Sequence, residues 1–310
     1  MIITVTLNPA LDKTAFVDKV ILNGLNRLDN IVYDVGGKGI NVCKTLVSLK
    51  QECLALGFVG GYNGELIINR LNELGINHDF VFSSSNTRTN LKLIDKNNNL
   101  TEFNEAGFSI SANQLNALLE KIEFHLKEND ILVLSGSSSK SIPDNIYETV
   151  INIANKHGSR VILDADGPLL KNGLKASPSL IKPNKFELCN FFNLDVNIDD
   201  ELLINLSKKL LNDKLKLIVL SNSKDGAYFI SKDIVYKADS LKLDVKSCVG
   251  AGDSMVAALA YGLSNNLSLP DLIKHSMSVA SLSVSKDIGT LIDIKDLNNL
   301  MDKVTYYQIY

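Results

Sequence analysis

The chain has 310 residues, of which 45% are hydrophobic and 22% charged, so it is a globular chain long enough for one large α/β domain or two small ones. Its net charge of −3 and its pI near 5.9 exclude a general electrostatic attraction to nucleic acid or to an anionic membrane. We therefore expect neither of these as a partner, and any anionic ligand must be held by individually placed cations.

The sequence also bears on the compartment. The amino terminus has no basic segment of the signal-peptide kind and reaches Asn8-Pro9 early, and no later apolar run is long enough to cross a bilayer. The four cysteines show no C-x-x-C spacing and the four histidines are scattered; the cysteines are Cys43, Cys53, Cys189 and Cys248. We expect free thiols, no zinc site and a cytoplasmic location.

Short β-branched runs alternate with helical patterns, which predicts an α/β fold with a mostly parallel central sheet flanked by helices. Strands are predicted at residues 2–7, 53–59, 131–134, 160–163, 180–182 and 217–220. Helices are predicted near residues 40–49, 65–74, 112–127, 144–156 and 201–211. Ser111 and Gln114 predict a capping box at the start of the third of these helices.

Two segments, at about residues 12–35 and 88–104, interrupt this rhythm with short alternating strands and no helix between them. Neither segment can bury much apolar surface alone, whereas paired they form a small sheet beside the main one, as a lid over a cleft does. We therefore predict a single domain over residues 1–310, with a lid made from two insertions. An exposed edge of that lid is suited to pairing with a second copy, so a homodimer is a plausible assembly.

The first motifs follow the first predicted strand. Asp12 is predicted at its carboxyl end, where open α/β sheets bind ligands and where a carboxylate can accept hydrogen bonds from sugar hydroxyls. A turn residue after a proline explains Asp12 equally well. Gly36-Gly37-Lys38-Gly39 precedes a helix that contains Asn41, and glycines there allow a ligand close to the backbone. The Walker A spacing is absent, and a hinge between lid and domain is a compatible explanation of these glycines.

Arginine is rare here: the 32 basic residues include Arg27, Arg70, Arg88 and Arg160, and the rest are lysines. Arg27 and Arg88 lie in the two predicted lid segments, where a guanidinium fork can clamp a phosphate, although each alone is also an ordinary surface residue. Ser137 follows the strand at 131–134, and its hydroxyl can bind substrate or simply belong to a turn.

Two later motifs suit a nucleotide. Asn184 and Glu187 have the pattern of an N-cap and its reciprocal partner, and the same groups can hold the water shell of Mg²⁺. Ser221, Ser223 and Gly226 lie in a strand-turn-strand segment that is suited to touching a nucleotide. The glycines within residues 57–64 invite a comparison with NAD-dependent dehydrogenases, but the G-x-G-x-x-G spacing is not met.

The most informative motif is the run from Val249 to Met255, in which Gly250 and Gly252 precede an apolar, alanine-rich helical pattern. Asp253 is therefore expected at a helix N-terminus, where free N–H groups and the helix dipole attract anions. A carboxylate beside an anion site is a candidate general base for a hydroxyl that is to be phosphorylated. An acidic residue behind a glycine turn is the alternative explanation.

Taken together, these motifs resemble the PfkB (ribokinase-like) carbohydrate kinase family over essentially the whole chain. The resemblance rests on four segments in the family's order and spacing, namely residues 6–12, 36–42, 182–187 and 249–255. Asn26-Arg27, Thr87-Arg88-x-Asn90 and Glu102-x-Asn104 are most similar to members that act on fructose 1-phosphate, and next to those that act on tagatose 6-phosphate. Ser223 departs from the pattern, since the family commonly has glycine there.

The resemblance implies transfer of the γ-phosphate of Mg-ATP to the C6 hydroxyl of fructose 1-phosphate. Asp253 would take the hydroxyl proton, and the glycine turn at Gly250 would present the N–H groups of Ala251 and Gly252 to the phosphoryl group. The implied sugar ligands are Asp12, Gly37, Asn41 and Ser137, and the implied ligands of its phosphate are Arg27, Lys38 and Arg88. Asn184 and Glu187 would order hydrated Mg²⁺, and Ser221, Ser223 and Gly226 would line the ATP site. The remaining alternative is a catalytically idle sugar-binding relative, against which Asp253 argues.

Overall fold

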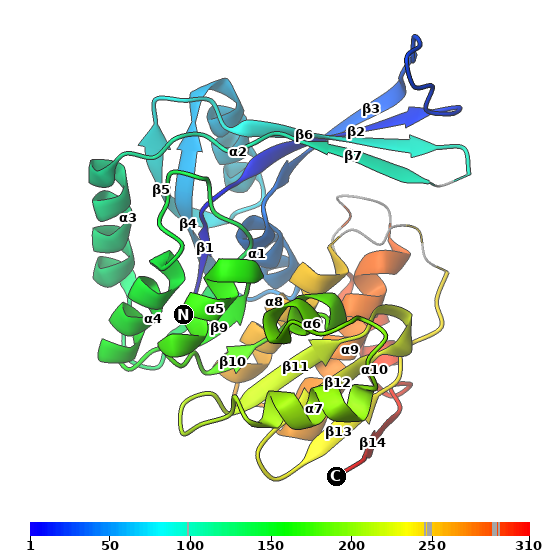
Figure 1. The fold of residues 1–310 in the computed structure, drawn as a ribbon. Coiled ribbons are helices and arrows are strands. Elements are labelled where there is room, and N and C mark those ends of the chain that lie inside the picture. Colours follow the sequence, from blue (N-terminus) through cyan, green and yellow to red (C-terminus); the bar gives the residue numbers. More distant parts are fainter. Residues whose placement is uncertain (98, 245, 247–249, 287–289, 291) are drawn as a thin grey trace.

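The computed structural model describes residues 1–97, 99–244, 246, 250–286, 290 and 292–310. Its described strands form one ten-stranded sheet, flanked by helices, and a separate four-stranded sheet (Figure 1). The predicted α/β fold class is therefore confirmed. Cys248 and Val249, which the sequence analysis named, lie outside the described residues.

The large sheet has the order β14-β13-β12-β11-β10-β9-β8-β1-β4-β5. Neighbouring strands from β5 to β11 are parallel, and β12 to β14 are added antiparallel at one side. The six predicted core strands are all present, as β1 (Ile2–Thr6), β4 (Cys53–Gly60), β8 (Ile131–Ser135), β9 (Arg160–Asp164), β10 (Leu180–Ile181) and β11 (Leu217–Ser221). Four further strands had no predicted range, namely β5 (Asn77–Ser83), β12 (Ala227–Ile230), β13 (Val235–Ala238) and β14 (Tyr306–Gln308).

Helices cover both faces of this sheet because successive side chains of a buried strand point to opposite faces. Ile2 packs in one apolar cluster with α1 (Lys38–Ser48), α2 (Gly61–Glu73), α8 (Ala251–Ser264) and α9 (Leu269–Ser285). Ile3 and Val5 pack in the other with α3 (Ala112–His125), α4 (Ile146–Lys156), α5 (Gly167–Lys175), α6 (Lys185–Phe192) and α7 (Asp200–Lys208). The last helix, α10 (Ile294–Met301), packs against α9.

The five helices with predicted ranges are present as α1, α2, α3, α4 and α7. The predicted capping box of α3 is confirmed, since Ser111 accepts from the backbone of Gln114 and the Gln114 side chain accepts in return. Among the described residues, no helix combines the length and the apolar character that a membrane span requires. Cys43, Cys53 and Cys189 are buried free thiols, as expected.

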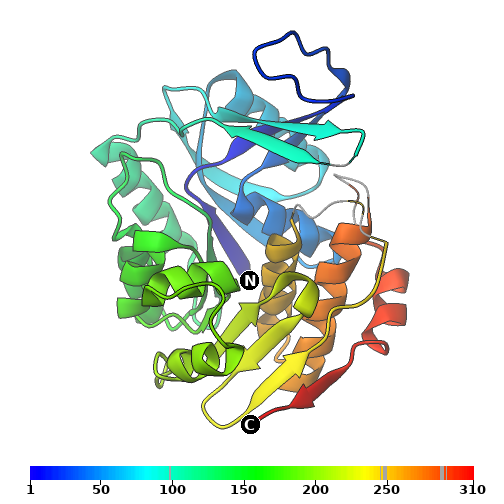
Figure 2. The ribbon, with the colours of Figure 1, turned by 45° about the vertical axis from the view of Figure 1, so that its right-hand side comes forward.

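The four-stranded sheet has the order β3-β2-β6-β7 and projects from the main body (Figures 1 and 2). Its strands are β2 (Ala10–Val17), β3 (Asp29–Gly36), β6 (Arg88–Asp95) and β7 (Leu100–Asn104), so two segments distant in sequence pair in it. The predicted position of Asp12 was wrong, because it lies inside β2 and not at the carboxyl end of β1. The chain leaves the large sheet after Thr6, and Pro9, which has no N–H for a ladder, lies in the connection to β2.

Candidate active site

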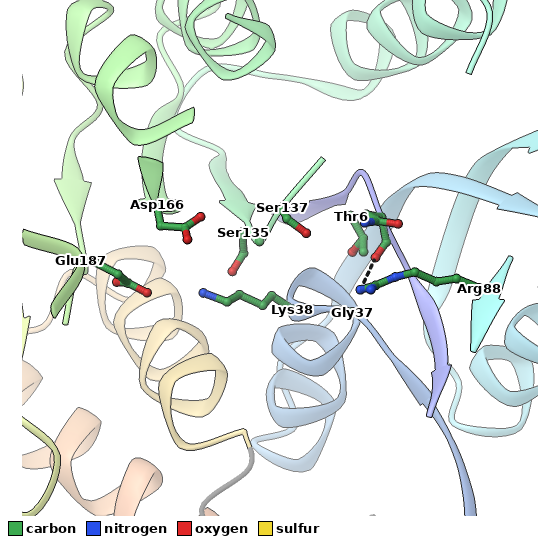
Figure 3. A pocket seen from close by; sticks show the side chains of 10 residues that line it. Thr6, Gly37, Lys38, Arg88, Ser135, Ser137, Asp166 and Glu187 are labelled. Carbon is green, nitrogen blue, oxygen red and sulfur yellow. Dashed lines mark hydrogen bonds between the residues drawn. The ribbon is translucent and has the colours of Figure 1, made fainter. Parts of the chain in front are cut away.

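A pocket of about 300 Å³ lies at the carboxyl ends of β1 and β8 and at the start of α1 (Figure 3). This is the edge at which open α/β sheets bind ligands. The predicted residues Gly37, Lys38, Arg88, Ser137 and Glu187 all line it. The remaining lining residues are Thr6, Asn8, Ser135, Gly136 and Asp166.

Asp253 lies at the start of α8, as predicted. Gly250 is the N-cap with φ 86°, a left-handed conformation that glycine adopts without steric cost, and no described side chain caps the helix. The first N–H groups of α8, at Ala251 and Gly252, have no partner within the helix and are therefore open to an anion. Oδ2 of Asp253 accepts a hydrogen bond of 2.8 Å from Nδ2 of Asn41 in α1.

The charge of Asp253 depends on its surroundings. Burial raises the pKa of Asp253 to about 6, and the negative charge of Asp164 contributes to this increase. The hydrogen bond from Asn41 and the positive charges of Lys38 and Lys182 act in the opposite direction. A carboxylate with this pKa is ionised at neutral pH and is a better proton acceptor than an ordinary aspartate.

Asp164, the last residue of β9, joins two lysines beside this carboxylate. It is 1% exposed, and its Oδ2 lies 3.2 Å from Nζ of Lys38 while its Oδ1 lies 3.1 Å from Nζ of Lys182. Ser135 Oγ donates a hydrogen bond of 2.9 Å to Oδ2. Burial alone would raise the pKa of Asp164, but Lys182 and Lys38 outweigh it and hold the pKa below its usual value. Neither Asp164 nor Lys182 was predicted from the sequence to have a role in the site.

Lys38 and Arg88 enter the pocket from different directions. The Lys38 side chain extends toward Glu187, whereas Arg88 lies on the opposite side, near Thr6 (Figure 3). Although burial lowers the pKa of Lys38, the charges of Asp164, Asp253 and Glu187 raise it above its ordinary value. Lys38 and Arg88 were predicted to bind the same phosphate of the sugar; both line this pocket, and their side chains are directed to different sides of it (Figure 3).

Arg88 is anchored at the edge of the small sheet. Its Nη1 donates 3.0 Å to the carbonyl oxygen of Glu105, and its Nη2 donates 3.4 Å to that of Asn8. Its buried Nε has no partner among the described residues. The buried oxygens Oγ1 of Thr6 and Oδ1 of Asn8 also lack partners in the described part of the chain.

Asp12 is held beside the pocket and is not one of its lining residues. Its Oδ1 accepts 2.9 Å from Nδ2 of Asn90, and its Oδ2 accepts 2.8 Å from Nζ of Lys92. A Cβ atom at Gly36 would lie 2.7 Å from this carboxyl group, so glycine leaves the space that Asp12 occupies. Arg27, in contrast, lies in the loop between β2 and β3 and does not line the pocket.

The predicted nucleotide residues lie at the start of α6 and around the turn that follows β11. The capping box of α6 is confirmed: Asn184 Oδ1 accepts 2.8 Å from Glu187 N, and Glu187 Oε2 accepts 2.9 Å from Asn184 N. Burial raises the pKa of Glu187. Ser221 ends β11 and forms an isolated bridge with Asn184. Ser223, which stands where the family commonly has glycine, adopts φ 48°.

Gly226 closes the same turn with φ 88°, and a Cβ atom there would lie 2.0 Å from the carbonyl oxygen of Ala238. Only glycine fits this approach between β12 and β13. Ser221, Ser223 and Gly226 therefore form one turn near Asn184, but none of them lines the pocket that contains Glu187.

Comparison with known proteins decides the family. The model of the pfkB family carbohydrate kinases matches residues 6–293. The chain belongs to the PfkB family of carbohydrate kinases. This PfkB kinase is 33% identical over 311 residues to the 1-phosphofructokinase of Borreliella burgdorferi, a match that covers 100% of this chain and 99% of the relative. It is 36% identical over 291 residues to the 1-phosphofructokinase of Bacillus subtilis, covering 94% and 95%.

Among solved structures, the tetrameric inhibited form of phosphofructokinase-2 from Escherichia coli superimposes with a TM-score of 0.89 at 26% identity, over 97% of this chain and 98% of that one. The PfkB kinase is thus a phosphotransferase of the sugar-kinase class, which removes the dehydrogenase alternative. The glycines within residues 57–64 serve the sheet and its helix, because Gly60 caps α2 without a side-chain bond and Gly57 pairs with Thr6.

Proposed function

We propose that this PfkB kinase is a 1-phosphofructokinase that transfers the γ-phosphate of ATP to the C6 hydroxyl of fructose 1-phosphate. The observation that carries the proposal is the buried Asp253 at the open N-terminus of α8, in contact with Asn41 and close enough to the lining residue Lys38 for their charges to interact. The names of the two full-length relatives support the choice of sugar. Tagatose 6-phosphate is the second candidate, on the sequence resemblance.

The proposed step requires a base and an anion site. Asp253 takes the proton of the C6 hydroxyl, the hydroxyl oxygen bonds to the γ-phosphorus, and the bond between that phosphorus and the bridging oxygen of ADP breaks. The N–H groups of Ala251 and Gly252, presented by the turn at Gly250, stabilise the charge on the transferred group. Asn41 keeps the Asp253 carboxylate in one orientation.

The sugar is placed by the other side of the pocket. Asp12, Gly37, Asn41 and Ser137 are the proposed ligands of its hydroxyl groups, and Arg88 is the proposed ligand of its phosphate. Arg88 is suited to this because it lines the pocket and because Nη1 and Nη2 each donate one hydrogen bond to the described residues, which leaves each with a second N–H for an anion. Arg27 joins this site only when the small sheet moves toward the pocket or when a second copy presents it.

Magnesium and ATP are the proposed cofactors. Glu187 uses Oε2 in the capping box, which leaves Oε1 for a hydrated cation, and Asn184 lies beside it. Bound Mg²⁺ neutralises charge on the phosphates of ATP. Ser221, Ser223 and Gly226 are the proposed lining of the nucleotide site, next to Asn184. A reaction that consumes ATP supports the cytoplasmic location expected from the sequence.

An ADP-release assay with ATP and Mg²⁺ tests the proposal over a panel of sugars. The panel comprises fructose 1-phosphate, tagatose 6-phosphate, fructose 6-phosphate and unphosphorylated fructose. We expect fructose 1-phosphate to give the highest kcat/KM. A higher value for tagatose 6-phosphate would replace the proposed substrate, and the absence of any stimulation by a sugar phosphate would refute the proposed function altogether.

The pH dependence of the reaction gives a further prediction. Because only ionised Asp253 accepts a proton, kcat/KM is expected to rise with pH through about 6, the raised pKa of this group. Initial rates at subsaturating sugar phosphate, measured from about pH 4.5 to pH 9, give the acid limb of the profile. An acid limb near the ordinary aspartate value of about 4 would contradict the assignment.

We also propose that the small sheet is a lid and that a second copy of the chain covers its outer side. Five consecutive residues of the edge strand β3 are exposed, and they include Ile31, Val32 and Tyr33. The loop before it exposes Leu22 at 81%. A long apolar edge of this kind is normally covered in solution. The related phosphofructokinase-2 has a tetrameric form, which supports self-association.

The dimer proposal predicts the effect of one charge. Val32→Glu is expected to shift the protein from dimer to monomer in analytical ultracentrifugation, because a carboxylate would be buried in the interface without a partner. Phe124→Glu is the matched control, since Phe124 is 81% exposed on α3 and lies outside the small sheet. A monomeric wild-type protein at micromolar concentration, or equal effects of both variants, would contradict the interface.

A further inference from the structure

A buried carboxylate, Asp164, contacts two of the residues that line the pocket, Lys38 and Ser135. Its described side-chain partners are Lys38 of α1, Lys182 directly after β10 and Ser135 at the end of β8. Burying an aspartate at 1% exposure costs several kcal/mol unless cations compensate it. Asp164 is therefore held ionised by the two lysines, and the lysines are in turn held by Asp164.

The two lysines lie next to the anion site at the start of α8. A Cβ atom at Gly252 would be 3.6 Å from Nζ of Lys182, so this ammonium group borders the first turn of the helix. The ammonium group of Lys38 is close enough to Asp253 and Glu187 for their charges to raise its pKa. One carboxylate thus fixes two positive charges beside the open N–H groups of α8.

Asp253 competes for the same cations. It is another buried carboxylate at this position, and its Oδ2 accepts from Asn41, with neither lysine in ion-pair contact among the described residues. A lysine that moved from Asp164 to Asp253 would neutralise the base and would lower its proton affinity. The arrangement keeps the base free and the ammonium groups available to the phosphoryl group.

We propose that Asp164 is a positioning residue for phosphoryl transfer, which holds the ammonium groups of Lys38 and Lys182 beside the start of α8 and away from Asp253. The proposal rests on the proposed kinase function. It assigns Lys38 to the transferred phosphoryl group, in place of the sugar's own phosphate. When that group arrives, the two lysines bind its oxygens as point charges on either side of Asp164.

Asp164→Asn separates this role from a structural one. Asparagine has the same size and keeps the hydrogen bond to Ser135, but it releases the lysines toward Asp253 and removes a like charge next to the base. We expect kcat to fall about 10²-fold, as for loss of a preorganised charge contact. We also expect the acid limb of kcat/KM to move below its wild-type position near pH 6, because Asp253 faces Asp164, Lys38 and Lys182.

Asp130→Asn is the matched control. Asp130 is also a buried aspartate with a cationic partner, the amino terminus at 2.6 Å, and it precedes β8 at the opposite end of that strand. This variant should lose stability without any movement of the acid limb. If Asp164→Asn likewise lowers only the melting temperature and leaves the limb in place, Asp164 is structural and the proposal is overturned.

Two further measurements complete the test. Asp164→Glu retains the charge and is expected to return the acid limb toward the wild-type position. In a double-mutant cycle with Lys38→Met, the losses of kcat are expected to be less than additive, because both substitutions remove the same ion pair between Asp164 and Lys38. Additive losses would overturn the proposal. If Asp164→Asn does not fold, Asp164→Glu carries the test by itself, because the longer side chain displaces both ammonium groups but keeps the charge. We then expect kcat to fall while the acid limb stays near its wild-type position, and an unchanged kcat would overturn the proposal.

The pKa of the Asp253 carboxyl can also be followed by ¹³C NMR, using Asp253→Asn to identify its signal. This readout does not require turnover, so it stays informative if wild-type protein phosphorylates no sugar phosphate. An inactive wild type refutes the proposed function. An unchanged Asp253 pKa in Asp164→Asn refutes the positioning role, whatever the substrate.

Discussion

Asp253→Asn is expected to lower kcat by about 10³- to 10⁴-fold while ATP binding remains measurable, since general-base catalysis contributes up to this amount. The substitution keeps the size of the side chain and a hydrogen-bonding contact with Asn41, but an amide does not accept the hydroxyl proton. Because Asp253 lies in the first turn of α8 and does not cap the helix, we expect α8 to stay folded in this variant. Steady-state ADP release gives kcat, and calorimetry gives the ATP dissociation constant.

Asp271→Asn is the control for this variant. Asp271 occupies the same kind of position, an acidic residue in the first turn of a helix, but it belongs to α9 and pairs with the capping residue Ser268. We expect kcat to stay within about twofold, because the loss concerns only helix capping and the dipole. Residual activity of Asp253→Asn above about a tenth of wild type would remove Asp253 from the role of base.

The glycine turn before α8 was predictable because its cause is local. Gly250 and Gly252 next to an apolar helical run imply a helix start without a side-chain cap, and the structure has one there among its described residues. The partner of Asp253 was not predictable in this way. Asn41 lies 212 positions away in the chain, and hydrophobic periodicity does not say which two helices become neighbours on a face of the sheet.

Asp164 was missed for a related reason. The predicted strand at 160–163 stopped one residue short of it. The prediction followed the apolar residues and therefore ended before a charged residue that still belongs to the strand. A buried aspartate is tolerated there only through its lysines, and Lys38 is 126 positions away. Asp12 was misplaced for a different reason. It was assigned to the carboxyl end of the first strand, where ligands bind in open α/β sheets, but the chain enters the small sheet at Ala10 and Asp12 lies inside β2.

The glycines within residues 57–64 invited comparison with a dinucleotide-binding motif. In the structure, glycine is required at position 57 for the packing of two strands. Gly57 faces Thr6 in the parallel pairing of β1 and β4 and has φ 144°. A Cβ atom on it would lie 2.0 Å from the carbonyl oxygen of Thr6. The glycine allows two central strands to approach at the point where Thr6 enters the pocket.

Gly57→Ala is therefore expected to destabilise the protein by about 3–5 kcal/mol, from a backbone conformation unfavourable to alanine and from the clash with a buried strand. Thr6 belongs to a central strand of the sheet and cannot move aside cheaply. Chemical denaturation monitored by circular dichroism measures the change in the free energy of unfolding.

Gly75→Ala is the control that isolates the conformational part of this loss. Gly75 has φ 66°, and a Cβ atom placed on it would have no described atom within 4 Å. This variant should cost only about 1–2 kcal/mol, the penalty for a left-handed conformation without a clash. Equal losses in the two variants would show that the close approach of β1 and β4 contributes nothing to the requirement for glycine.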